Sequence, residues 1–151
     1  MIPTLAHVAD FLVELGQPIA LGETAQGLRR VVPITGGTIR GARLEGTILN
    51  AGADFQMIGP DGFTRLEARY VVRLVDGALL YVENSGVRFG PPEVMARITR
   101  GEPVDPTQVY FRSTPRFEIA EPAYQWLTRP LFIASGARHP DRVALSVFEV
   151  G

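Results

Sequence analysis

The chain has 151 residues, 21% of them charged and 46% hydrophobic, and a net charge of −1, which is the balance of one globular domain (1–151). It contains no cysteine, and all fifteen basic residues are arginine, so thiol chemistry, iron–sulfur clusters and every mechanism that needs a lysine amine are excluded. The nearly neutral charge gives no broad attraction for phosphates, and we expect neither a nucleic acid nor a membrane surface as partner.

The N-terminal segment does not have the pattern of a targeting signal. It lacks a basic leading stretch, and Asp10 and Glu14 interrupt its apolar residues. No stretch of the chain approaches the roughly 20 apolar residues that a membrane span requires. We therefore expect a cytoplasmic protein.

Sixteen glycines and twelve prolines divide the chain into short segments, at the spacing typical of β-sandwiches and β-barrels. The turns that we expect include Gly36-Gly37, the segment 60–62, Gly86 and Gly136. The predicted strands are 8–15, 28–34, 43–49, 53–58, 63–75, 78–84, 109–118, 130–135 and 142–150.

The clearest alternation lies in 63–75, where every second residue from Leu66 to Leu74 is apolar and the residues between them are mostly charged. Asp76-Gly77 follows directly, and an Asp-Gly pair between two strand-like segments strongly indicates a β-hairpin.

Two segments are predicted to be short helices. The segment 91–99 begins with proline and has a glutamate in its first turn, and the segment 122–127 is a second, weaker candidate. Both are short enough to serve only as covers on the ends of a larger structure. About nine strands must hide their edges, and closing the sheet on itself removes the edges altogether. We therefore predict an all-β, closed antiparallel barrel of about eight to nine strands with one or two short covering helices.

Four motifs in this order resemble those of an uncharacterised bacterial and fungal family, known as domain of unknown function 3237 or uncharacterised protein family 0311. They are 52–56 (GADFQ), 67–70 (EARY) with Asp76-Gly77, 110–114 (YFRST) with 117–118 (FE), and 124–127 (YQWL). The resemblance extends roughly from residue 15 to residue 150. It implies a small antiparallel β-barrel and no particular activity.

A group of polar residues on the predicted strands is the candidate site. Arginine suits a carboxylate, enolate or phosphate because its planar group offers paired donors, and a partly buried aspartate can serve as acid or base. We expect Arg69 and Arg112 to hold an anion and Asp54 to be the acid or base. The expected ligand-binding residues around them are Gln56, Tyr70, Asn84, Tyr110 and Trp126.

This hypothesis depends on which faces of the strands point inward. If the charged face of 63–75 is the solvent face, Arg69 points outward and Tyr70 fills the core. In another alternative, Asp54 and one arginine form an internal ion pair that fixes strand register, with no ligand.

The histidine and glycine motifs give weaker evidence of function. His139 lies between Ser135 and Asp141, but no Gly-x-Ser-x-Gly sequence frames the serine. The histidines have no metal-binding spacing, so no metal is expected. The glycines at 36–37 precede a predicted strand rather than a helix, and so predict a hairpin turn instead of a phosphate loop.

The sequence favours a barrel that binds a small anionic or carbonyl-bearing metabolite without a cofactor. The alternatives are a cofactor-independent enzyme (isomerase, cyclase or hydrolase) that uses the same residues, and a solid barrel with a structural role. Apolar Leu5 and Phe148 near the chain ends leave room for a homodimer.

Overall fold

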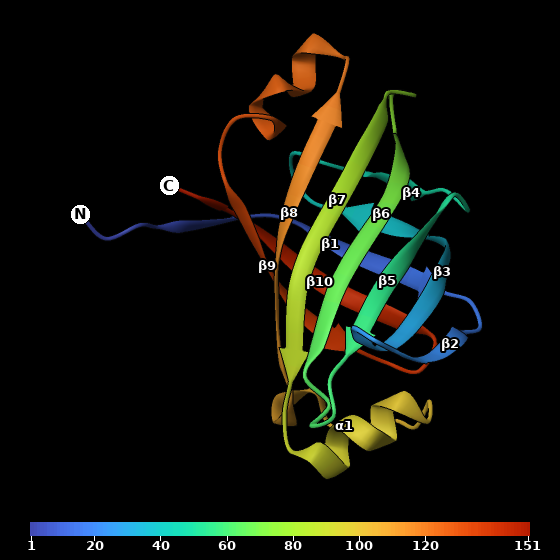
Figure 1. The fold of residues 1–151 in the computed structure, drawn as a ribbon. Coiled ribbons are helices and arrows are strands. Elements are labelled where there is room, and N and C mark those ends of the chain that lie inside the picture. The colour runs from blue at the N-terminus through green and yellow to red at the C-terminus, as the bar shows by residue number, and fades with distance from the viewer.

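The computed structural model describes residues 1–151 and consists mainly of ten β-strands (Figure 1). The strands are β1 (Leu5–Leu15), β2 (Ile19–Thr24), β3 (Gly27–Arg40), β4 (Gly46–Ile48), β5 (Gly52–Ile58), β6 (Thr64–Leu74), β7 (Leu79–Phe89), β8 (Tyr110–Ile119), β9 (Phe132–Arg138) and β10 (Arg142–Val150). One α-helix, α1 (Pro92–Thr99), and two 3₁₀ helices, η1 (Pro106–Gln108) and η2 (Pro122–Leu127), complete the fold. No helix has the length and apolar character needed to cross a bilayer.

Eight of the strands close an antiparallel barrel, as predicted. Their order around the ring is β1, β10, β9, β8, β7, β6, β5 and β3, and β3 returns to β1. The other two strands are extensions of ring positions and are not counted among the eight. After the break at Gly16, β2 follows β1 along the same edge of β3, and β4 precedes β5 between β3 and β6.

The β6–β7 hairpin is confirmed and is the longest regular pairing, together with β7–β8. Asp76 accepts a hydrogen bond from the backbone N–H of Ala78 (3.0 Å). Gly77 has a φ of 92°, a left-handed conformation that favours glycine. The Asp76-Gly77 turn therefore sets the register between β6 and β7.

Most inward-facing side chains form one apolar core. Twenty-one buried residues make up this cluster, including Phe11, Tyr70, Val82 and Phe117. On β6 the residues Leu66, Tyr70 and Val72 face the core, so the alternation of 63–75 is confirmed with its charged face toward solvent.

The covering helices lie at opposite ends of the barrel (Figure 1). Helix α1 begins after Pro91 and buries Val94, Met95 and Ile98. The predicted second helix is present as the 3₁₀ helix η2, in which hydrogen bonds join residues three positions apart rather than four.

Several predicted turns were wrong. Gly36 and Gly37 lie inside β3, and Gly86 and Gly136 lie inside β7 and β9. A Cβ at Gly37 would lie within 2.0 Å of the Leu12 carbonyl oxygen, so this glycine allows β3 to pass close to β1. Strand β2 was not predicted, because its residues are mostly exposed and show no clear alternation.

Candidate functional site

The barrel end beneath α1 contains a cavity of about 700 Å³. This volume is in the range of pockets that hold small organic molecules. Its lining includes four arginines and only two aspartates, so the cavity has an excess of positive charge. The charged side chains are Arg30, Asp54, Arg88, Arg100, Arg138 and Asp141.

Strand alternation explains why polar groups face this cavity. On β7 the inward positions continue from Leu80 and Val82 through Asn84 and Gly86 to Arg88. On β5 the inward positions are Asp54 and Gln56. Every second residue of each strand points into the barrel. These residues are apolar in the half of the barrel away from α1 and include polar side chains in the half near α1.

Arg88 is the most unusual of these residues. Its exposed fraction is 4%, and the structure gives it no hydrogen-bond partner and no ion pair within 4.0 Å. Its guanidinium lies 5.6 Å from the centre of the Phe111 ring. Burial lowers the pKa of Arg88 to about 10, an effect that the nearby Asp54 opposes. The side chain therefore stays cationic at neutral pH.

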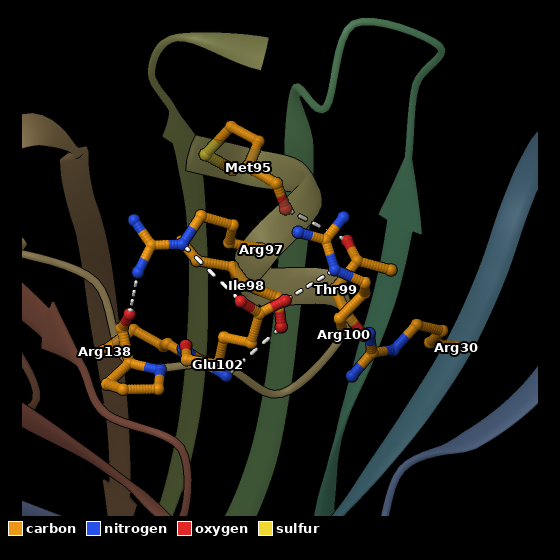
Figure 2. Close-up of polar contacts among 9 residues, drawn as sticks. Arg30, Met95, Arg97, Ile98, Thr99, Arg100, Glu102 and Arg138 are labelled. Carbon is orange, nitrogen blue, oxygen red and sulfur yellow. Dashed lines mark hydrogen bonds and ion pairs between the residues drawn. The ribbon is translucent and has the colours of Figure 1, made fainter. Parts of the chain in front are cut away.

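Arg30 and Arg138 connect the barrel to the end of α1 (Figure 2). Arg30 donates to the carbonyl oxygen of Thr99 (3.0 Å), and Arg138 donates to the carbonyl oxygens of Ile98 (3.1 Å) and Glu102. Cations are favourable here because the carbonyl end of a helix is its negative end. These two arginines thus hold the cover in place, whereas Arg88 has no such partner.

Asp54 lies on the same cavity and is held by two donors. Gln56 Nε2 donates to Asp54 Oδ2 (2.9 Å), and the backbone N–H of Glu67 donates to Asp54 Oδ1 (3.1 Å). Burial raises the pKa of Asp54, against the opposing effects of the Gln56 hydrogen bond and the Arg88 charge. Asp54 is therefore a carboxyl group whose proton affinity is increased by its surroundings.

The rest of the cavity wall is largely apolar. It includes Leu15, Val32, Ile98, Phe111 and Val143 from five different elements. Phe111 packs on the backbone of β9, since a Cβ at Gly136 would lie 2.7 Å from the Phe111 ring. The site thus combines hydrocarbon walls with a few polar groups, as is usual for small-molecule pockets.

Several predicted site residues are brought together. Asp54 and Gln56 line the cavity, whereas Asn84 is buried on an inward position of β7 but does not line it. Tyr70 is buried in the apolar core, and its hydroxyl group has no hydrogen-bond partner. Burial raises the pKa of Tyr70.

The predicted positions of Arg69, Arg112, Tyr110 and Trp126 were wrong. Arg69 pairs with Ala53 and Arg112 with Val87, and both side chains are exposed on the outer face, opposite to the face of Asp54. Tyr110 is 46% exposed and stacks on Phe89. Trp126 lies in η2 at the opposite end of the barrel, where the Arg43 guanidinium is 3.8 Å from its ring centre.

The cavity arginines were missed, although the sequence contains their signal. Arg30 alternates with Leu28, Val32 and Ile34 on one strand face. Arg88 and Arg138 lie beyond the predicted strand ends at 84 and 135, and continuing the alternation past Gly86 and Gly136 would have placed both inside.

Two further depressions lie elsewhere. One, of about 570 Å³, lies beside β8 and the segment 127–133, and another, of about 770 Å³, lies over β1, β9 and β10. Neither contains a buried charged side chain, so the cavity under α1 is the candidate site.

Fold and cavity together define this chain as a closed antiparallel β-barrel with a polar cavity at one end. The chain belongs to the family described as protein of unknown function (DUF3237), whose model matches residues 3–150. A relative from Rhodopseudomonas palustris, described as a UPF0311 protein, is 47% identical over 152 residues, covering 99% of each chain. The family resemblance inferred from the four motifs is therefore confirmed.

Solved structures agree with this fold. The R. palustris protein has a TM-score of 0.97 at 45% identity, covering 100% of this chain and 99% of that one. A β-barrel-like protein from Acinetobacter baumannii has a TM-score of 0.88 at 36% identity, covering 100% and 98%. A protein described as an enzyme from Penicillium herquei has a TM-score of 0.75 at 18% identity, covering 100% and 96%, which shows a shared fold alone.

Proposed function

We propose that the cavity under α1 binds a small organic anion, with Arg88 as the principal anion contact. The observation that carries this proposal is the state of Arg88, a buried side chain that has no hydrogen bond or ion pair and whose Nε is a buried donor without a partner. An unpaired buried charge costs a protein several kcal/mol, so such groups normally have a partner. An anionic ligand would supply that partner.

The chemistry of Arg88 also indicates the ligand group. A guanidinium offers paired donors that match a carboxylate or an enolate, and the Nε atom of Arg88 is a free buried donor. Apolar walls on five elements favour a ligand with a hydrocarbon part. The proposed ligand class is therefore a carboxylate or other carbonyl-bearing metabolite.

A second candidate function is a cofactor-independent enzyme, such as an isomerase, cyclase or hydrolase. The observation that favours it is the pairing of Asp54, whose pKa burial raises, with the cationic Arg88 on one cavity. Asp54 would transfer a proton, and Arg88 would stabilise the developing negative charge. Arg88 then takes the role first expected for Arg69 and Arg112.

Calorimetric titration with benzoate, phenylacetate and citrate tests binding. The wild type should bind at least one of these anions, and Arg88→Met should lose that binding because the anion contact is removed. Arg73→Met is the matched control, since Arg73 is exposed on the outer face of β6. If Arg88→Met binds every anion as tightly as the wild type does, the proposal is wrong.

Catalysis is tested on the anions that bind. Each is incubated with the protein and followed by proton NMR for chemical change or for solvent deuterium incorporation. A reaction that Asp54→Asn abolishes, while affinity is largely retained, supports the enzymatic function. A reaction that survives Asp54→Asn would exclude Asp54 as the acid or base.

A further inference from the structure

The cavity region has free hydrogen-bond acceptors as well as free donors. Gln56 Oε1 and Asn84 Oδ1 are buried and have no hydrogen-bond partner. Gln56 lines the cavity beside Asp54, whereas Asn84 lies on an inward position of β7, two strands away, and does not line it. The interior thus has a donor region at Arg88 and an acceptor region around Gln56.

The hydrogen-bond network fixes the orientation of the Gln56 amide. Its Nε2 group donates to Asp54 Oδ2 at 2.9 Å. When Asp54 is ionised, its carboxylate only accepts hydrogen bonds, and the reversed amide would then place two acceptors against each other. Gln56 Oε1 is therefore the free atom, and it requires a donor.

A simple carboxylate would satisfy only part of this site. It could pair with Arg88, but it carries no donor for Gln56 Oε1. Leaving buried acceptors unsatisfied is costly, so a ligand that also supplies a donor gains affinity.

The charge of the cavity selects the kind of donor. An ammonium group would enter a region that contains four arginines and two aspartates, where the net positive charge opposes it. A hydroxyl group donates a hydrogen bond without adding charge, so it suits the free acceptor of Gln56.

We infer that the ligand is a hydroxycarboxylate with an apolar frame, its carboxylate at Arg88 and its hydroxyl group at the free acceptor Gln56 Oε1. This inference rests on the proposed binding function and names the substrate class of the same cavity. It distinguishes hydroxylated acids from the parent acids of the same shape.

Matched acids provide the test. Calorimetric titration compares benzoate with meta- and para-hydroxybenzoate, and phenylacetate with mandelate. At least one hydroxylated acid should bind about tenfold or more tightly than its parent, the effect of one added buried hydrogen bond. Gln56→Leu should bring that ratio close to one, because it removes the acceptor of the ligand hydroxyl group.

Gln26→Leu is the control, because Gln26 lies in the exposed turn between β2 and β3. Equal affinities within each pair, with both acids lost in Arg88→Met, would overturn the hydroxyl assignment and leave the anion site intact. A hydroxyl preference that survives Gln56→Leu would also overturn it. If no acid binds the wild type at about 10 mM, too weak for a specific site, both proposals fail.

Discussion

Arg88 and Asp54 line one cavity from β7 and β5 without forming an ion pair. Asp54 is held instead by Gln56 and by the backbone of Glu67, and Arg88 is held by no polar group. The two charges attract each other across the cavity. The alternative in which Asp54 and an arginine form a satisfied internal pair therefore does not describe this site.

Arg88→Met should stabilise the protein in the absence of ligand. Methionine fills much of the same space and removes a buried unpaired charge, so the free energy of unfolding should rise by about 1–3 kcal/mol. Urea unfolding followed by the fluorescence of Trp126 measures this change. The exposed Arg73→Met should change stability by less than about 0.5 kcal/mol. A less stable Arg88→Met protein would mean that Arg88 has a structural partner.

Asp54→Asn should stabilise the protein at neutral pH and have little effect in acid. The folded-state pKa of Asp54 is raised, so folding favours its protonated form, and the wild type loses stability as the pH rises from about 3.9, the unfolded value, through the folded pKa. Asparagine cannot ionise and avoids this loss. Unfolding free energies measured between pH 3 and pH 8, about the range of carboxyl titration, should diverge with increasing pH. Parallel curves would contradict the raised pKa.

Arg138→Met should loosen the end of α1. The carbonyl oxygens of Ile98 and Glu102 lose the hydrogen bonds from Arg138, so amide hydrogen exchange should become faster in the segment 95–102 and stay unchanged in β6 and β7. Arg100→Met is the control on the same segment, because its ion pair with Glu102 is exposed and contributes little. Equal exchange rates in the two variants would show that Arg138 does not hold the helix.

Gly136→Ala should destabilise the fold and narrow the cavity. The added methyl group would lie 2.7 Å from the Phe111 ring, which must move toward the cavity that it lines. Overpacking of this kind costs about 1–3 kcal/mol, measured as a lower urea midpoint. Gly59→Ala should have a much smaller effect, since its nearest neighbour is the movable Asp61 side chain at 3.3 Å. A neutral Gly136→Ala would show that Phe111 is free to shift.

Local patterns predicted the fold because they depend on neighbouring residues only. The alternation of 63–75, the Asp76-Gly77 turn and the proline at the start of α1 each carry their signal within a few residues. Closure of the barrel followed from the number of strands. The glycines at 36, 37, 86 and 136 were misassigned as turns because each faces a close neighbour that the sequence does not reveal: a backbone at Gly37 and Gly86, the Phe111 ring at Gly136 and the Glu14 carboxylate at Gly36.

The candidate site was predicted in part. Asp54, Gln56 and Asn84 face inward as expected, but the choice between inner and outer faces was wrong for Arg69 and Arg112. On β6 the apolar face alone could have decided this, since the core takes Tyr70 and leaves Arg69 outside. The arginines that do face inward lie near strand ends, where element boundaries are least certain. A homodimer, a cytoplasmic location and the lack of a cofactor stay predictions.

The pairing between β8 and β9 is shorter than every other strand pairing in the ring. It consists of two residue pairs, Arg112–Ser135 and Ser113–Ala134, whereas β7 and β8 share ten. Pro115 follows on β8 and has no N–H to extend the ladder. The barrel is thus a single curved sheet that is closed by one short strand pairing. Phe111 and Arg138 lie near this β8–β9 pairing, and both line the cavity. The shortest strand pairing of the ring therefore borders the space where a ligand would lie.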